Sequence, residues 1–289
     1  MNTQNLSRTL DSSARRIAAP SRSGRMYLAR ITMLGFIAIA CMAPTAWAQN
    51  VLLGTAGNFG VLAGSKVTNT GPTVVNGSVG VWPGTSITGF PPGSVFPGSG
   101  TLHSADAVAQ QAQSDLTAAY VDAANRVCGT TIAAGLLGGL TLTPGVYCMG
   151  AGNLTGTLTL NGPGVYIFQM ASSLTTAPGS SVVLIGGASA CNVFWQVTSS
   201  ATIDTSTAMA GNILALSSIS LNTGASIRGK ALARDAAATL DNGNVTACSG
   251  SSAAAAGATA LPTLSEWTMI VMMGLLSLAG FARLRRSAI

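Results

Sequence analysis

Charged side chains are scarce in this sequence of 289 residues: Asp, Glu, Lys and Arg together make up 8%, and aromatic residues make up 5%. Disordered chains carry far more charge, so the composition excludes a largely disordered protein. The formal net charge of +6 comes from the two ends, since residues 49–250 hold five basic and six acidic side chains. The middle of the chain is nearly neutral, which argues against a phosphate-binding surface, and we expect no nucleic-acid partner.

Groups that carry catalysis or bind metals are also few. His103 is the single histidine, there is no Cys-x-x-Cys pair, and the repeated coils described below offer only Asp204, Asp235 and Asp241 as acids. Enzymes that cleave polysaccharides on solenoid folds need convergent carboxylates with a metal or a general acid. We therefore expect no enzyme, no catalytic residue, no metal and no cofactor, and we interpret His103 as a loop residue.

The first 48 residues have the features of an export signal. An apolar run at 31–42 follows two arginines and precedes Ala-Trp-Ala at 46–48, a small-x-small cleavage pattern. The run is too short to span a bilayer comfortably, which disfavours a membrane anchor. We predict a signal peptide over residues 1–48, with Met26 as an alternative start of translation.

The other end of the chain has the features of a membrane and sorting segment. An Ala/Gly/Ser linker at 251–260 leads to 261–289, where an apolar stretch separates Trp267 from three arginines. Such a stretch is typical of a transmembrane helix whose arginine end is cytoplasmic. The string Leu-Pro-Thr-Leu-Ser-Glu-Trp at 261–267 resembles the IPTL-type C-terminal sorting signals of Gram-negative bacteria, with Leu261 in place of the usual Ile. The resemblance implies export to the cell envelope or surface, or secretion, with sorting machinery as a partner. Cleavage of the tail and a plain membrane anchor are both left open.

Cysteine use agrees with export. Cys41 lies in the predicted signal peptide, which leaves four cysteines for two disulfides in three possible connectivities. We predict the pairs Cys128–Cys148 and Cys191–Cys248.

The middle of the chain, residues 49–250, contains repeats. Residues 57–71 parallel residues 211–224, and the C-terminal half repeats three short strands per unit, first between residues 165 and 185. Three strands per coil are typical of an all-β solenoid, a parallel β-helix of triangular cross-section.

Small polar residues mark the expected corners of this solenoid. Asp204, Asn222 and Asp241 fall at the same place in successive coils. We predict that they adopt the left-handed backbone of a sharp turn, because Asn and Asp tolerate it. A carboxylate cluster with a chemical role is not needed to explain these positions.

Alternation along the second strand of each coil predicts two outward columns of short polar side chains. Apolar residues such as Leu154 and Leu174 would point inward. One outward column contains Thr155, Thr175, Thr202, Ser220 and Thr239, and the other contains Ser173, Ser200 and Ser218. Hydroxyl residues also suit an ordinary solvated strand, but such strands usually carry Lys, Glu, Gln or Arg, which are nearly absent here. The predicted surface is a flat, uncharged grid of hydroxyls and methyls, whose spacing suits a crystalline ligand.

One helix interrupts the strands. Ser104 is a good N-cap for a helix that runs to about Val127. Its apolar stripe is narrow and consists of Ala105, Val108, Ala112, Leu116, Ala119, Ala123 and Val127. We predict that the helix lies over the first strands of the coils, which are apolar on both sides, as at Phe194 and Trp195.

The repeated region resembles a family of bacterial and fungal ice-binding proteins. The matching stretches are Asn58–Gly64, Thr68–Thr73, Ala105–Ala107, Leu140–Tyr147, Val193–Val197 and Gly211–Ala215. The resemblance implies a discontinuous right-handed parallel β-helix with one long α-helix alongside. It also implies that N-terminal strands fold back to complete the far end of the solenoid.

The same resemblance implies a protein that adsorbs to ice through one flat face, so the ice surface is the expected partner and a monomer the expected state. The predicted outward columns are the candidate site. A Thr-Gly-x-Thr element at 70–73 is similar to a motif of some members, so the choice of face stays open, as does the ice plane. The alternative function is a cell-surface adhesin or structural solenoid without ice activity.

Overall fold

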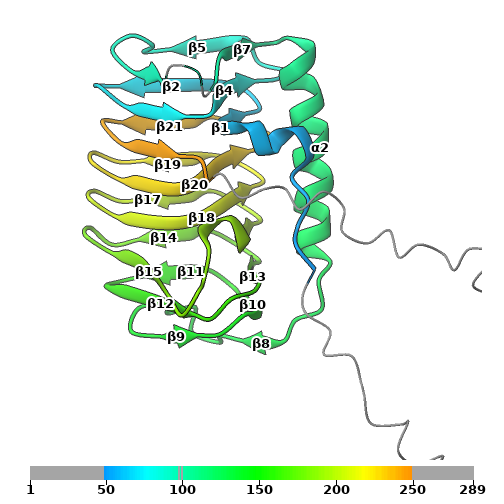
Figure 1. The fold of residues 1–289 in the computed structure, drawn as a ribbon, viewed down its shortest axis with the longest axis vertical. Coiled ribbons are helices and arrows are strands. Elements are labelled where there is room, and N and C mark those ends of the chain that lie inside the picture. Colours follow the sequence, from blue (N-terminus) through cyan, green and yellow to red (C-terminus); the bar gives the residue numbers. More distant parts are fainter. Residues whose placement is uncertain (1–48, 97, 99, 249–289) are drawn as a thin grey trace, which may run out of the picture. The chain divides into compact units, whose positions relative to one another are not determined.

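The computed structural model describes residues 49–248 apart from 97 and 99, and these residues belong to the second of two compact units, Trp47–Ile289. The strands wind into a solenoid with three strands per coil, and the strands of neighbouring coils pair in parallel (Figure 1). This arrangement confirms the predicted fold class. Two short 3-10 helices, η1 (Gly54–Asn58) and η2 (Ala190–Asn192), lie outside the strands.

One side of the solenoid is a seven-stranded sheet, which we call the hydroxyl face. In spatial order its strands are β11 (Gly152–Leu154), β14 (Leu174–Thr176), β17 (Ala201–Ile203), β19 (Ile219–Leu221), β21 (Ala238–Asp241), β2 (Lys66–Thr70) and β5 (Ser86–Thr88). Leu174, Ala201, Ile219 and Ala238 are buried, as predicted for the inward positions.

The other two sides belong to one 15-stranded sheet, because two long strands continue across a corner. The helix face contains β8 (Thr130–Thr131), β10 (Gly145–Met149), β13 (Tyr166–Met170), β16 (Val193–Val197), the second halves of β18 (Ala208–Ala215) and β20 (Ser226–Ala233), β1 (Phe59–Ala63), β4 (Ser78–Val81) and β7 (Leu102–Ser104). The third face contains β9 (Thr141–Leu142), β12 (Thr157–Asn161), β15 (Ser181–Ile185), the first halves of β18 and β20, β22 (Asn244–Thr246), β3 (Val74–Asn76) and β6 (Ser94–Val95). Gly229 takes β20 across the corner at φ 146°, and a Cβ there would lie 2.0 Å from the carbonyl oxygen of Gly211, so only glycine fits.

The coils are not stacked in chain order. The last C-terminal coil lies against the first N-terminal coil, since β20 pairs with β1, β21 with β2 and β22 with β3. Strands β4 to β7 follow, and a helix then returns the chain to β8 at the opposite end (Figure 1). This is the discontinuous arrangement that the family resemblance implies. It gives the similar stretches 57–71 and 211–224 equivalent places in different coils.

The returning helix, α2 (Ala107–Ala124), confirms the predicted element but not its predicted start. Asp106 is the N-cap, and its Oδ1 accepts a hydrogen bond of 2.8 Å from the backbone N–H of Ala109. Ser104 instead ends β7. The physical reason is that Ala105 has φ 50°, a left-handed backbone that a right-handed helix cannot include.

The helix covers the helix face, as predicted. Its buried residues are Ala109, Ala112, Gln113, Leu116, Ala119, Tyr120 and Ala123. Five of them, Ala112, Leu116, Ala119, Tyr120 and Ala123, form an apolar cluster with outward side chains of the strands, among them Ile167 and Phe194. Val108 and Val127 are 49% and 88% exposed, so the prediction that these two residues belong to the buried stripe is wrong, and Ala105 lies before the helix begins. Compared with the predicted stripe, the side of the helix that faces the sheet is rotated, so that it includes Ala109 and Tyr120.

Core side chains stack in the same register as the strands that carry them. Tyr147, Phe168 and Trp195 lie one above another, with ring centroids 5.4 and 4.1 Å apart. The buried indole N–H of Trp195 donates to the carbonyl oxygen of Ala210 at 3.0 Å. This close packing holds the coils in register, so the outer surfaces inherit the regular spacing of the strands.

Both predicted disulfides are present. Cys128–Cys148 joins the segment after α2 to β10, with a Cα–Cα distance of 5.9 Å. Cys191–Cys248 joins η2 to the end of the described region, with a Cα–Cα distance of 5.6 Å. The disulfides therefore fasten the coil that follows the helix and the last C-terminal coil.

The predicted signal peptide (1–48), linker (251–260) and C-terminal sorting and transmembrane segment (261–289) lie outside the described residues. Among residues 49–248, as far as the structure describes them, no helix is long and apolar enough to cross a membrane.

Candidate functional site

A column of short polar side chains runs along the middle of the hydroxyl face. Each member pairs in register with the next across the ladders of the sheet. We call it the central column, and in spatial order it contains Asn153, Thr175, Thr202, Ser220, Thr239, Thr68 and Thr88. All seven side chains are exposed or half-buried. Neighbouring members repeat at the strand spacing of about 4.7–4.9 Å.

Thr155 does not belong to this column, so that part of the sequence prediction is wrong. The register pairs Asn153 with Thr175, while Leu154 pairs with the buried Thr176. The prediction aligned Leu154 with Leu174, but the inward position opposite Leu174 is held by Gly152. A Cβ on Gly152 would lie 2.6 Å from the terminal methyl of Met170, which shows that a neighbouring side chain fills the space. Thr155 is exposed beyond the end of β11.

Thr68 and Thr88 extend the central column beyond the coils that sequence analysis considered. Thr68 pairs with Thr239 on one side and with Thr88 on the other. A signal for Thr68 existed in the similarity between residues 57–71 and 211–224, which places β2 and β19 at the same side of the solenoid. Thr88 had no such signal.

The predicted second column also lies in register, at the start of each strand of the hydroxyl face. The backbone N–H of the residue after each member donates to a serine or alanine carbonyl oxygen of the next coil at 2.9–3.1 Å. Ser218 Oγ donates to Ser200 Oγ at 2.9 Å, and Ser173, Ser200 and Ser218 are all half-buried. We call these three residues the flanking column. The hydroxyls of Ser200 and Ser218 therefore partly satisfy each other.

Charged groups lie at the margins of the hydroxyl face. Asp204, Asn222 and Asp241 stack at one corner as predicted, and Asn222 Nδ2 donates to Asp204 Oδ1 at 3.0 Å. This hydrogen bond and those from Thr205 hold the pKa of Asp204 below its usual range. Lys66 is exposed at the opposite margin, at the start of β2. The centre of the face therefore presents hydroxyls and one amide without a formal charge.

The predicted left-handed backbone occurs at these corners, but on other residues. Ser206 and Asn242 have φ 54° and 45°, and Gly224 has φ 72°. Each of these residues follows Asp204, Asn222 or Asp241 by one or two positions, because the residue with the left-handed backbone lies within the turn and not at its start.

A further correction concerns the Thr-Gly-x-Thr element at 70–73. Its last hydroxyl belongs to Thr73, which is fully buried.

The other two sides of the solenoid are less suited to a flat contact. The helix face is covered by α2. The third face carries the exposed Arg228, and its apolar Val183 and Ile185 are 40% and 43% exposed. By contrast, the sequence has no charged residue between Arg126 and Asp204, so three strands of the hydroxyl face come from an uncharged stretch.

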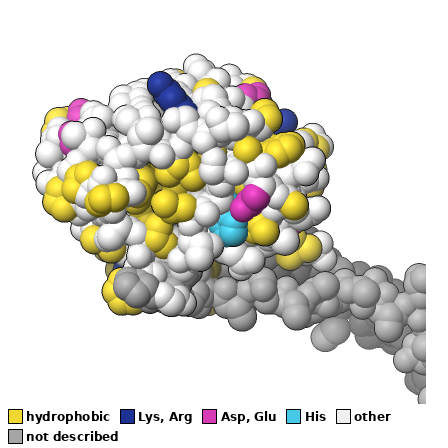
Figure 2. Space-filling view, turned by 90° about the horizontal axis from the view of Figure 1, so that it is seen from above, with side chains coloured by type: hydrophobic (Ala, Val, Ile, Leu, Met, Phe, Trp, Pro, Cys, Tyr) yellow, Lys and Arg dark blue, Asp and Glu magenta, His cyan; other side chains and the backbone are white. Residues whose placement is uncertain are grey.

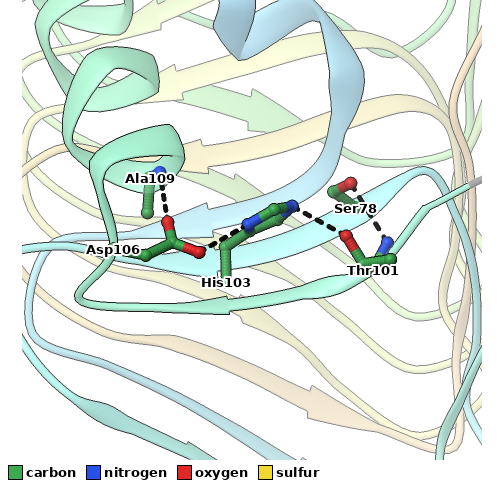
Figure 3. Close-up of polar contacts among 5 residues, drawn as sticks. All are labelled: Ser78, Thr101, His103, Asp106 and Ala109. Carbon is green, nitrogen blue, oxygen red and sulfur yellow. Dashed lines mark hydrogen bonds and ion pairs between the residues drawn. The ribbon is translucent and has the colours of Figure 1, made fainter.

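His103 has partners that the sequence did not reveal. It lies in strand β7, not in a loop, and it links Thr101 to Asp106 (Figure 3). In the part of the chain that the structure describes, no three His, Cys, Asp or Glu side chains are grouped as metal ligands would be.

Comparison with known proteins identifies the family. The Ice-binding-like family matches residues 61–246, and the IPTL-CTERM motif matches residues 259–286. An ice-binding protein of Nostoc sp. (strain HG1) is 48% identical over 74% of this chain and 80% of its own length. An ice-binding protein of Colwellia sp. is 33% identical over 79% of this chain and 92% of its own.

Solved structures agree with this assignment. An ice-binding protein from an Antarctic biological consortium has a TM-score of 0.66 and 48% identity, covering 69% of this chain and 92% of that one. An ice-binding protein of the Antarctic ascomycete Antarctomyces psychrotrophicus has a TM-score of 0.67 and 41% identity, covering 70% of this chain and all of that one. The family match spans most of the solenoid, so this chain belongs to the Ice-binding-like family.

Proposed function

We propose that this protein adsorbs to ice through the hydroxyl face, as an antifreeze or inhibitor of ice recrystallisation. The observation that carries the proposal is the central column, in which seven short polar side chains from successive coils lie in register. The family membership and the names of the relatives support it. The flanking serines would contribute at the margin of the same contact.

The physics of the face suits a solid lattice. Residues of the central column repeat at the spacing of paired strands, and the columns are separated by the two-residue repeat along each strand. Threonine has a stiff side chain, so little rotamer entropy is lost when it is held against a surface. Each hydroxyl contributes only about 1 kcal/mol or less, but a rigid array engages many at once. Adsorption of this kind needs no catalytic group on the face.

We further propose that the chain is exported. Residues 1–48 would be removed as a signal peptide, residues 49–250 would form the ice-binding domain, and residues 251–260 would link it to the tail. The IPTL-CTERM match supports sorting to the cell surface or secretion in a Gram-negative bacterium. Before any processing, residues 261–289 would hold the protein in the membrane as a monomer.

The same sorting motif suits a surface adhesin or structural spacer, which is the second candidate function. The two candidates differ in what the hydroxyl face contacts. An adhesin would bind cells or polysaccharide and leave a growing ice crystal unchanged.

The test is thermal hysteresis and recrystallisation inhibition by the purified chain. Thr202→Tyr places a large ring in the middle of the central column and should abolish most of the activity. Thr246→Tyr is the matched control, because Thr246 is exposed on the third face. Loss of activity in both variants, or in neither, would reject the hydroxyl face. An inactive wild-type chain that binds cells or polysaccharide would favour the adhesin.

A further inference from the structure

A chain of three hydrogen-bonded side chains lies on the helix face, separate from the hydroxyl face. Thr101 Oγ1 is 2.8 Å from His103 Nε2, and His103 Nδ1 is 2.7 Å from Asp106 Oδ2. Figure 3 shows the three side chains in line, with Asp106 also bonded to the start of α2. A hydroxyl, an imidazole and a carboxylate in this order form the arrangement that activates an oxygen nucleophile.

The hydrogen bonds define which atoms of the three side chains carry protons. The backbone N–H of Ala109 and the His103 ring hold the pKa of Asp106 below its usual range, so Asp106 is a carboxylate at neutral pH. A carboxylate only accepts hydrogen bonds, so His103 Nδ1 carries the proton that it donates to Asp106. In the neutral ring, Nε2 is then the acceptor for the Thr101 hydroxyl. This is the tautomer that a general base needs.

The nucleophile is accessible, and an N–H group lies beside it. Thr101 is exposed, and the side chains of His103 and Asp106 are 18% and 42% exposed. Figure 2 looks onto this end of the solenoid and shows a histidine and an acidic side chain together at the surface. The carbonyl of Thr101 accepts from Val79 of β4, and the C=O and N–H of a trans peptide point in opposite directions. The N–H of Leu102 is therefore directed away from β4, along the open edge of β7.

We propose that Thr101 and His103 form an acyl-transfer site that takes small activated esters, with Asp106 as the positioning residue. Thr101 Oγ attacks the ester carbonyl carbon while its proton moves to His103 Nε2. The new C–O bond forms, the bond to the leaving alkoxide or phenoxide breaks, and His103 returns the proton to the leaving oxygen. Water then hydrolyses the acyl-threonine by the same route and restores the hydroxyl. The N–H of Leu102 is placed to donate to the negative oxygen that develops on the carbonyl.

The test uses the full chain with 4-nitrophenyl acetate as the probe. Release of 4-nitrophenolate measures turnover, and mass mapping of quenched samples locates the acetyl group on Thr101. We expect Thr101→Val, His103→Gln and Asp106→Asn each to lower turnover and labelling roughly 100-fold. Thr101→Ser keeps a hydroxyl nucleophile, so it should lose less turnover and labelling than Thr101→Val.

Asp106→Asn separates chemistry from structure, because asparagine is also a good N-cap and can still accept from Ala109. This variant should stay folded, with an unfolding midpoint lowered only as far as the loss of the carboxylate requires, while kcat falls and KM stays near the wild-type value. Acetyl groups found only on amines, or equal turnover in wild type and Thr101→Val, would overturn the proposal. Wild-type turnover in Asp106→Asn would also overturn it. In those cases the three side chains only fasten strand β7 to the start of α2. The outcome does not depend on ice adsorption.

Discussion

At the scale of the residue, the hydroxyl face depends on short side chains that stay where the backbone puts them. Threonine is β-branched, so the backbone of a strand fixes its hydroxyl and methyl within a narrow range. Lysine or glutamate at the same positions would add length, charge and several free torsions. Ser220 within the central column and Asn153 at its end are also uncharged and shorter than lysine or glutamate.

The register of the central column makes a residue-scale prediction that differs from the sequence pattern. Thr68→Tyr should lower ice-recrystallisation inhibition as strongly as Thr202→Tyr, because Thr68 lies in the column beside Thr239. Thr155→Tyr should leave it nearly unchanged, because Thr155 lies beyond the strand end. Activity would be measured at equal concentrations of folded protein. The reverse order of effects would show that the contact surface is not this column.

At the scale of the element, one carboxylate of the helix accepts hydrogen bonds from the N-terminal segment, beside the apolar contacts of Val51 and Ala56. The backbone N–H and the hydroxyl of Thr55 in η1 both donate to Asp115 Oδ2 at 2.7 Å, and Gln111 donates to Oδ1 at 2.9 Å. Gly54 precedes this contact with φ 51°, and a Cβ there would lie 2.5 Å from the same carboxylate. The close approach of η1 to α2 therefore requires glycine at that position.

This contact predicts acid sensitivity. Burial raises the pKa of Asp115, but the hydrogen bonds from Thr55 and Gln111 outweigh burial, and the pKa lies below its ordinary value. The pKa of Asp106 is lowered as well. A lowered carboxyl pKa stabilises the fold above the ordinary aspartate pKa of about 3.9, and the stabilisation is lost as pH falls through the folded-state pKa.

The measurement is the thermal unfolding midpoint as a function of pH. The midpoint should hold near neutral pH and fall between about pH 5 and pH 2. Asp115→Asn should unfold at lower temperature than wild type at pH 7 and show a smaller decrease in acid. An equal decrease in both proteins would mean that Asp115 does not account for the acid sensitivity.

At the scale of the whole molecule, a solenoid is stable only when its end coils are secured. Here the last C-terminal coil is buried between coils from both halves of the chain, and Cys191–Cys248 fastens its end. Cys128–Cys148 fastens the coil at which the chain restarts after α2. The disulfides therefore secure both points where chain order and spatial order diverge.

The two disulfides should differ in their effect on stability. In the chain-entropy account, removing the link across 57 residues costs about 4 kcal/mol and removing the one across 20 residues costs about 3 kcal/mol. The pairs Cys191→Ser with Cys248→Ser, and Cys128→Ser with Cys148→Ser, would be compared by denaturant unfolding. A larger loss for the shorter loop would indicate that native-state packing, not the unfolded chain, dominates the effect.

The sequence predicted side-chain positions best where a local pattern repeats. Alternation identified Thr175, Thr202, Ser220 and Thr239, because the side chains of a strand must alternate between its two faces. It failed at Thr155, where an inward glycine hides the alternation and Met170 fills the space from another coil. It also missed the partners of His103, since strand and helix cap meet there only after Ala105 turns the chain.

Composition and periodicity by themselves determined the solenoid, its three strands per coil, the presence of the helix and the scarcity of charge on the middle of the chain. These properties are local, because each residue type has its own preference for strands, turns or helix caps. The family resemblance implied the order of the coils, and the tertiary structure alone decided the true register at Gly152 and the place of Thr88 in the central column. Stacking brings together residues far apart in the chain, and steric fit between coils sets that register.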